Sequence, residues 1–207
     1  MDPLGWAANV LEAFGPLGVF LLLVLESVVP PIPSEAVLLL AGHLVDEGRF
    51  SWVAVFLASV AGSLVGASIL YWGAAWLGEQ RLRALVARFG RPFGLRAADF
   101  DKADAWFERH GPVVVSFGRL VPIVRSLVSV PAGWNRMPFG RFLLYTAAGS
   151  AVWNGALIGA GVAVGERWEV VRGWMQRFEL LVALAVAGAA VWFVVRRWKA
   201  KRALATS

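Results

Sequence analysis

GPVVVSFGRLVPIVRSLVSVPAG, residues 111 to 133, is the stretch that decides the fold. This apolar segment of membrane length carries Arg119 and Arg125 near its middle, with Pro122 between them. An arginine deep in a bilayer is costly unless it faces protein or water. The proline removes a backbone donor and biases Val121 away from the helical region. Because broken backbone at membrane depth persists only where it lines a cavity or is covered by protein, we predict a re-entrant hairpin with both arginines at its tip.

The composition is that of a membrane protein. The 207 residues are 58% hydrophobic and only 16% charged, with a mean hydropathy of +0.64, so we predict a single membrane domain over 1–207. Cysteine is absent, and His43 and His110 lie far apart without a third ligand, so no metal site and no cofactor are expected. The net charge of +6 does not predict a nucleic-acid partner, because Lys and Arg gather at the ends of apolar segments.

A second re-entrant hairpin is predicted near the N-terminus. Residues 2–14 have the spacing of a short amphipathic helix at the membrane interface. Residues 16–40 are apolar except for Glu26 and Glu35, which flank the broken centre VVPPIPS. Each arm has about 10 to 14 apolar residues, whereas a spanning helix needs about 20. The centre is broken by three prolines, Pro30, Pro31 and Pro33, to which we assign the same structural role as to Pro122.

Three further segments are predicted to cross the bilayer completely, namely 50–78, 142–165 and a shorter one over 180–195. Residues 80–110 are rich in Arg and predict cytoplasmic amphipathic helices, while 178–207 predict a C-terminal transmembrane helix with a basic tail. The bias of Lys and Arg among the loops places the N-terminus outside and the C-terminus in the cytoplasm. The two hairpins would then enter from opposite sides, and their tips would meet near the midplane.

An internal repeat supports this arrangement. AGSLVGASILYWGAAWLGE (61–79) and AGSAVWNGALIGAGVAVGE (148–166) align without gaps over 19 positions, with seven identities. Each follows a predicted hairpin that begins with Gly-Pro and ends with Ala-Gly. A single crossing separates the hairpins, so the units 15–79 and 111–166 would form an inverted repeat. In transporters of this kind the substrate site lies at the repeat interface near the midplane.

The ionisable residues of the two hairpins are the candidate site. Glu26 and Glu35 would face Arg119 and Arg125. Each guanidinium offers a planar fork of donors that suits a phosphate, and buried carboxylates are plausible proton carriers in transport. We therefore expect Arg119 and Arg125 to bind the substrate and the two glutamates to couple protons. The alternative is that the four charges only neutralise each other and pin the hairpins together.

Other polar and small residues in the spans have simpler interpretations. Gly62 and Gly66 form a GxxxG motif, which predicts close helix packing within the monomer, with a homodimer contact as the alternative. Asn154 and Tyr71 are expected to make interhelical hydrogen bonds.

The motif FGRLVPIVRSLVSVPAG, together with Glu26 and the following PPIPSE, resembles the DedA family of bacterial membrane proteins, whose fold is shared by eukaryotic lipid scramblases with VTT domains. The resemblance covers roughly residues 15–165. It implies two facing re-entrant hairpins, a location in the bacterial inner membrane and translocation of lipids, undecaprenyl phosphate for some members. The essential acids of the family map onto Glu26 and Glu35, and its arginines onto Arg119 and Arg125. Many members carry Gly-Asp where this chain has Ser34-Glu35.

Two classes of function therefore compete. The first is a membrane lipid transporter or flippase for undecaprenyl phosphate or a phospholipid, which would be proton-coupled if the glutamates titrate. The second is a proton-coupled cation antiporter, with Glu26 and Glu35 as the site and the arginines as counter-ions. An enzyme is not expected, because neither histidine lies where it would activate a nucleophile.

Overall fold

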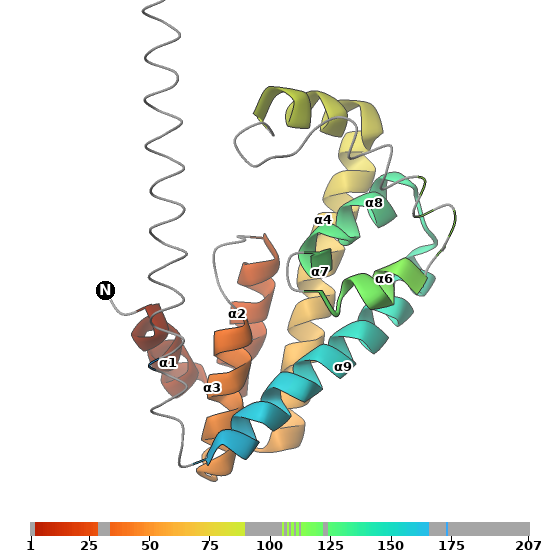
Figure 1. Ribbon diagram of the computed structural model, residues 1–207. Coiled ribbons are helices and arrows are strands. Elements are labelled where there is room, and N and C mark those ends of the chain that lie inside the picture. The colour runs from red at the N-terminus through yellow and green to blue at the C-terminus, as the bar shows by residue number, and fades with distance from the viewer. Residues whose placement is uncertain are drawn as a thin grey trace, which may run out of the picture.

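The computed structural model describes residues 3–28, 34–89, 105, 107, 109, 111, 113–121, 124–165 and 173. This part of the chain contains helices and no strands, so the all-α class is confirmed for it. The helices, shown in Figure 1, are α1 (Pro3–Phe14), α2 (Pro16–Val28), α3 (Ser34–Asp46), α4 (Trp52–Phe89), α6 (Val113–Gly118), α7 (Val124–Leu127), α8 (Ser129–Trp134) and α9 (Phe139–Val164).

Among the described residues, two stretches are long and apolar enough to cross a membrane, Trp52–Ala84 in α4 and Phe139–Val164 in α9. They match the predicted spans 50–78 and 142–165. Only 33% and 28% of their most apolar windows are buried, so most of these side chains face outward, unlike those of a core helix in a water-soluble protein. The backbone of α4 is kinked at Gly78, whose φ of 72° suits a residue without a Cβ.

Some predicted segments lie outside the described residues. These are the third span over 180–195 with the rest of 178–207, most of the cytoplasmic segment 80–110, and the four prolines of the predicted hairpin breaks. Of the segment 80–110, the structure describes the last part of α4, which continues to Phe89.

The N-terminal helices are short. Helices α2 and α3 have 13 residues each, about 20 Å at 1.5 Å per residue, which is less than the roughly 30 Å of a hydrocarbon core. The predicted amphipathic helix over 2–14 is present as α1. It packs against α2 and α3 through buried Ala7 and Leu11, while Trp6 and Phe14 are exposed.

The segment 111–133 is not one continuous helix. Helix α6 ends at Gly118, α7 begins at Val124, and α8 follows at Ser129. The predicted interruption between Arg119 and Arg125 is therefore present. Gly111, with φ 57°, precedes this segment just as Gly15, with φ 58°, precedes α2, so both predicted hairpins begin at a glycine in the left-handed region.

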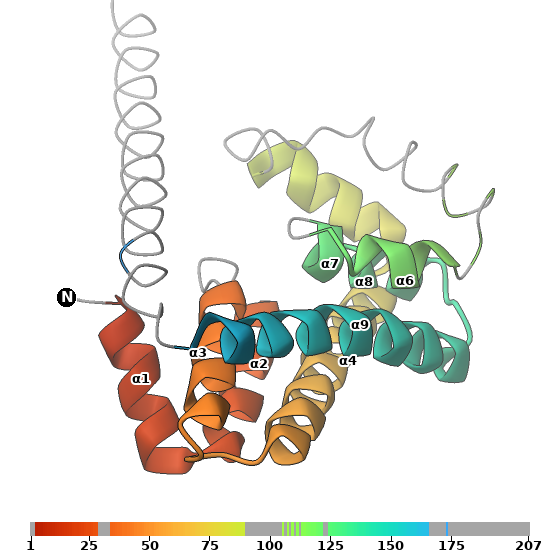
Figure 2. The same cartoon turned by 60° about the horizontal axis from the view of Figure 1, so that its bottom comes forward.

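The short helices flank the crossing of α4 and α9 on two sides, as Figures 1 and 2 show. On one side, α2 packs on α4 and α3 packs on α9. On the other side, α6 packs on α9 and α8 packs on α4. Each group of short helices is therefore attached to both long helices.

Glycines make the closest of these contacts. A Cβ at Gly42 of α3 would overlap the carbonyl oxygen of Ile158 in α9, and one at Gly133 of α8 would overlap the carbonyl oxygen of Tyr71 in α4. Tyr71 and Ile158 occupy equivalent positions of the sequence repeat, and both glycines belong to the Ala-Gly ends of the predicted hairpins. The two contacts are thus related as the repeat alignment would require.

A second pair of close glycine contacts also involves equivalent positions of the repeat. A Cβ at Gly62 of α4 would lie 2.6 Å from the carbonyl oxygen of Phe20, and one at Gly149 of α9 would lie 2.6 Å from that of Ser116. Gly62 and Gly149 are also equivalent in the repeat. At Gly66 a Cβ would overlap Ser27 of α2, so the prediction that the GxxxG motif serves packing within the chain is confirmed.

The expected interhelical hydrogen bonds are present. The hydroxyl of Tyr71 donates to the carbonyl oxygen of Met137, just before α9. The Nδ2 group of Asn154 donates to Ser59 Oγ at 3.3 Å and to Ser63 Oγ at 3.2 Å, which joins α9 to α4. These bonds hold the two long helices in register beside the candidate site.

Candidate functional site

The two arginines lie on either side of the interruption in segment 111–133. Arg119 is in the turn that ends α6, where its backbone N–H donates to the carbonyl of Ser116 at 3.2 Å. Arg125 is in the first turn of α7, and its N–H donates to the carbonyl of Val121 at 2.9 Å. Both are buried, with 5% and 7% of their surface exposed. The broken backbone thus carries two guanidinium groups into the protein interior.

Arg125 binds the other group of short helices. Its Nη2 group donates to Glu26 Oε1 on α2 and to Ser34 Oγ at the start of α3. Its Nε lies 3.8 Å from Glu35 Oε1, and the Glu35 side chain is 36% exposed. Glu26 itself is 7% exposed. The buried pair of Arg125 and Glu26 therefore connects residues far apart in the sequence. The contact between Arg125 and Glu35 is longer and more exposed to solvent.

Arg119 is bonded differently. Its Nη2 group donates to Ser129 Oγ on α8 at 2.7 Å, and its buried Nε–H has no hydrogen-bond acceptor. Among the described residues no carboxylate oxygen lies within 4.0 Å of it. We expected the two glutamates to face both arginines, but the structure pairs them with Arg125 alone. A buried donor without a partner costs about 1–3 kcal/mol, so this site retains unused binding capacity.

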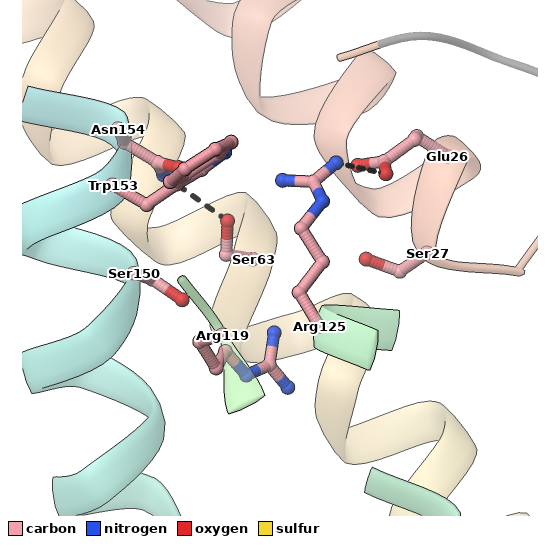
Figure 3. A pocket seen from close by; sticks show the side chains of 8 residues that line it. All are labelled: Glu26, Ser27, Ser63, Arg119, Arg125, Ser150, Trp153 and Asn154. Carbon is pink, nitrogen blue, oxygen red and sulfur yellow. Dashed lines mark hydrogen bonds and ion pairs between the residues drawn. The ribbon is translucent and has the colours of Figure 1, made fainter. Parts of the chain in front are cut away.

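The two arginines share one cavity, shown in Figure 3. Side chains from α9 form one side of it, and Glu26 and Ser27 from α2 lie on the other. The lining residues are Glu26, Ser27, Ser63, Arg119, Arg125, Ser150, Trp153 and Asn154. The cavity is small, so a bound headgroup would have to widen it.

Sequence reasoning missed the neutral part of this site. Ser34 and Ser129 accept hydrogen bonds from the arginines, and Trp153 contributes an indole to the cavity. Ser63 and Ser150, which are identical in the repeat alignment, also line the cavity. The available signal was the presence of hydroxyl groups within apolar segments, because a buried hydroxyl needs a partner.

The charges of the site favour an anion. Arg125 is paired with Glu26 and lies 3.8 Å from Glu35, whereas the equally buried Arg119 has no carboxylate partner among the described residues. Guanidinium groups bind phosphate through parallel hydrogen bonds and stay charged when buried. The arrangement can therefore hold a phosphate-like group.

Comparison with known proteins identifies the family of this chain. The model of the VTT domain matches residues 32–163. An alkaline phosphatase-like protein of Lactococcus lactis subsp. cremoris is 36% identical over 181 residues, which cover 87% of this chain and 84% of that protein. Undecaprenyl phosphate transporter A of Staphylococcus aureus is 28% identical, covering 90% of this chain and 92% of that protein.

Undecaprenyl phosphate transporter A of Bacillus subtilis is also similar, with 29% identity over 80% of this chain and 82% of that protein. No solved structure matches. The chain therefore belongs to the VTT-domain family, also called the DedA family, as the hairpin motifs predicted.

Proposed function

We propose that this protein transports an anionic membrane lipid, undecaprenyl phosphate or a phospholipid, between the leaflets of the bacterial inner membrane. The observation that carries this proposal is the buried Arg119, whose guanidinium has a free Nε–H and no carboxylate partner among the described residues. A permanent charge in such a place is stabilised when an anion arrives. The names of the two transporter relatives point to the same cargo.

The two arginines have different tasks in this scheme. Arg119 is available for the phosphate at once. Arg125 is engaged by Glu26 and Ser34, so it can join the phosphate only when that contact is given up. Protonation of Glu26 would remove the charge that holds Arg125, which is a simple way to couple protons to lipid movement. Glu35, more exposed and 3.8 Å from Arg125, is the second group that we assign to proton coupling.

The same proposal includes the membrane arrangement. Helices α2 and α3 would form one re-entrant hairpin and α6 to α8 the other, within inverted repeats 15–79 and 111–166. The shortness of these helices and the exposed apolar side chains of α2 (Leu17, Leu21, Leu25 and Val28) support it, because such side chains suit lipid better than water. The N-terminus would lie outside and the C-terminus in the cytoplasm, and the acyl or prenyl tail would stay in lipid while the headgroup passes the arginines.

Transport is favoured over hydrolysis, despite the name of the Lactococcus relative. Hydrolysis would need an activated nucleophile or a metal. Two of the cavity hydroxyls make other hydrogen bonds, since Ser27 donates to the Leu23 carbonyl and Ser63 accepts from Asn154. In the part of the chain that the structure describes, no three side chains of the metal-binding types lie together.

The cation antiporter is less well supported. A cation site on Glu26 and Glu35 would need carboxylates that are free to coordinate it. Glu26 is instead bonded to Arg125, and Glu35 lies next to the same guanidinium. A cation entering there would meet a buried positive charge.

The test is translocation by purified protein in vesicles that contain undecaprenyl phosphate. A membrane-impermeant phosphatase added outside hydrolyses only the outer leaflet, so about half of the lipid stays protected unless the protein moves it. We expect the wild type to expose the protected half and Arg119→Gln to leave it protected. Vesicles without added phosphatase report hydrolysis by the protein itself, and we expect none.

The matched control is Arg141→Gln, an exposed arginine near the start of α9 that should not affect transport. Wild-type protein that leaves the inner leaflet protected would refute lipid transport. Phosphate release without added phosphatase would show that the protein is an enzyme.

A further inference from the structure

The cavity contains a second buried hydrogen-bond donor without a described acceptor, the indole N–H of Trp153. Its indole Nε1–H is shielded from solvent and has no hydrogen-bond acceptor in the described part of the chain. The indole lines the same cavity as Arg119, whose Nε–H is the other unpaired donor there. An indole N–H can only donate, so the group that would satisfy it must be an acceptor.

Arg119 packs against the helix that carries Trp153. The Cβ of Arg119 packs over Gly149 of α9, where a glycine Cβ would lie 2.9 Å from it. Trp153 is four residues further along α9, so it occupies the same face of the helix one turn away. Figure 3 shows Trp153 and Ser150 on this wall of the cavity, with the two arginines beside it. A group bound to Arg119 would therefore lie within reach of α9.

The repeat alignment shows that the position of Trp153 differs between the two halves of the chain. Trp153 is aligned with Gly66 of the first repeat, where the glycine lets Ser27 of α2 pack directly on α4. At the corresponding place on α9 a large side chain with a polar edge replaces the glycine. The two repeats therefore differ at this position, and the larger residue lines the cavity beside Arg119, which has no carboxylate partner among the described residues.

We propose that the indole N–H of Trp153 is a third ligand for the phosphate, beside Arg119 and Arg125. The inference deepens the proposed function and rests on it only in assigning a phosphate to this cavity. The donors Arg119 Nε–H and Trp153 Nε1–H are free, whereas the one buried carboxylate of the cavity, Glu26, is already bonded to Arg125. The free groups therefore suit the acceptor oxygens of a phosphate. They offer nothing to an ammonium group, so a phosphate monoester fits better than a zwitterionic headgroup.

The direct test follows the indole itself by NMR. Wild-type protein labelled with 15N at the indole nitrogens has 11 tryptophans, and the signal of Trp153 is the one that Trp153→Phe removes. Undecaprenyl phosphate, inorganic phosphate and undecaprenol are added in separate titrations. We expect a downfield shift of this N–H with undecaprenyl phosphate and none with undecaprenol. A shift with inorganic phosphate as well would show that the headgroup alone suffices. An unmoved signal at saturating undecaprenyl phosphate, or an equal shift with undecaprenol, would overturn the inference.

Binding by variants gives a second measurement. Trp153→Phe keeps the aromatic bulk and removes the N–H, and we expect undecaprenyl phosphate to bind about tenfold more weakly, as for loss of a hydrogen bond to a charged group. Trp76→Phe is the matched control, because that indole on α4 is 79% exposed. Equal affinity of Trp153→Phe and wild type would contradict the proposal. Wild-type protein whose Trp153 signal responds to phosphate but which moves no lipid in vesicles would instead refute the transport function alone.

Discussion

Removing one partner of the buried contact between Arg125 and Glu26 should strongly destabilise the described helices, and a double-mutant cycle measures the coupling. The two side chains are 8% and 9% exposed, and they join the first group of short helices to the second. Removing one partner of a buried ion pair leaves an uncompensated charge and typically costs about 3–5 kcal/mol. Arg125→Met should therefore lower the free energy of unfolding by about that amount.

Removing both charges should be far less harmful. The double variant Glu26→Gln with Arg125→Met leaves no buried charge at the pair, so we expect most of the loss to be recovered and a coupling energy of about 3 kcal/mol. Glu35 will replace little of the missing contact, since it is 3.8 Å from Arg125 and 36% exposed. The assay is equilibrium unfolding in mixed micelles followed by circular dichroism.

An exposed pair on the same protein provides the control. Arg83 Nε lies 2.6 Å from Glu79 Oε1, but these side chains are 31% and 45% exposed. A double-mutant cycle on this pair should give a coupling energy of about 0.3–0.5 kcal/mol, as for other surface pairs one helical turn apart. A coupling energy below about 1 kcal/mol for Arg125 and Glu26 would refute the reasoning, because the pair would then behave as if it were solvated.

Three further changes are predicted. Arg119→Met should leave the free energy of unfolding unchanged or higher, because no carboxylate loses its partner; a loss above about 3 kcal/mol on denaturation would contradict this. Gly161→Ala should lower the free energy of unfolding by about 1–3 kcal/mol, because the new Cβ would overlap a carbonyl of α3. Gly159→Ala in the same helix has nothing within 4 Å of its new Cβ, so it should be neutral or stabilise the protein by up to about 1 kcal/mol. Equal melting temperatures of these two variants would contradict the packing of α9 on α3. Tyr71→Phe should cost about 1–3 kcal/mol by leaving the Met137 carbonyl unpaired, and an unchanged unfolding curve would be evidence against that bond.

Much of the described fold could be predicted from the sequence because a bilayer allows few solutions. Uncharged runs of spanning length identified the long helices α4 and α9. The proline between Arg119 and Arg125 predicted the interruption, since a helix cannot continue unchanged through it. The structure agrees with the repeat alignment, because Tyr71 and Ile158, which meet glycines of the short helices, occupy equivalent positions in it.

The pairing within the site could not be predicted in the same way. Charge counting placed two acids opposite two arginines, but it did not indicate that Arg125 would take both acids. That outcome depends on where each side chain leaves the backbone. Arg125 lies in the first turn of α7 and reaches Glu26 of α2, while Arg119 follows the end of α6 and reaches Ser129. The role of Trp153 was hidden for a related reason, since an indole in an apolar span resembles any other lipid-facing aromatic residue until its neighbours are known.

Helix α3 packs on α9 and helix α8 packs on α4, so each half of the chain packs on a long helix of the other half, and this has a consequence for biosynthesis. Gly42 of α3 finds its complementary surface on α9, more than a hundred residues later in the chain. During synthesis, the face of α3 around Gly42 therefore stays uncovered in the bilayer until α9 has been made and packs against it. Synthesis that stops before α9 should yield a product exposed to membrane proteases, however well its own helices have formed.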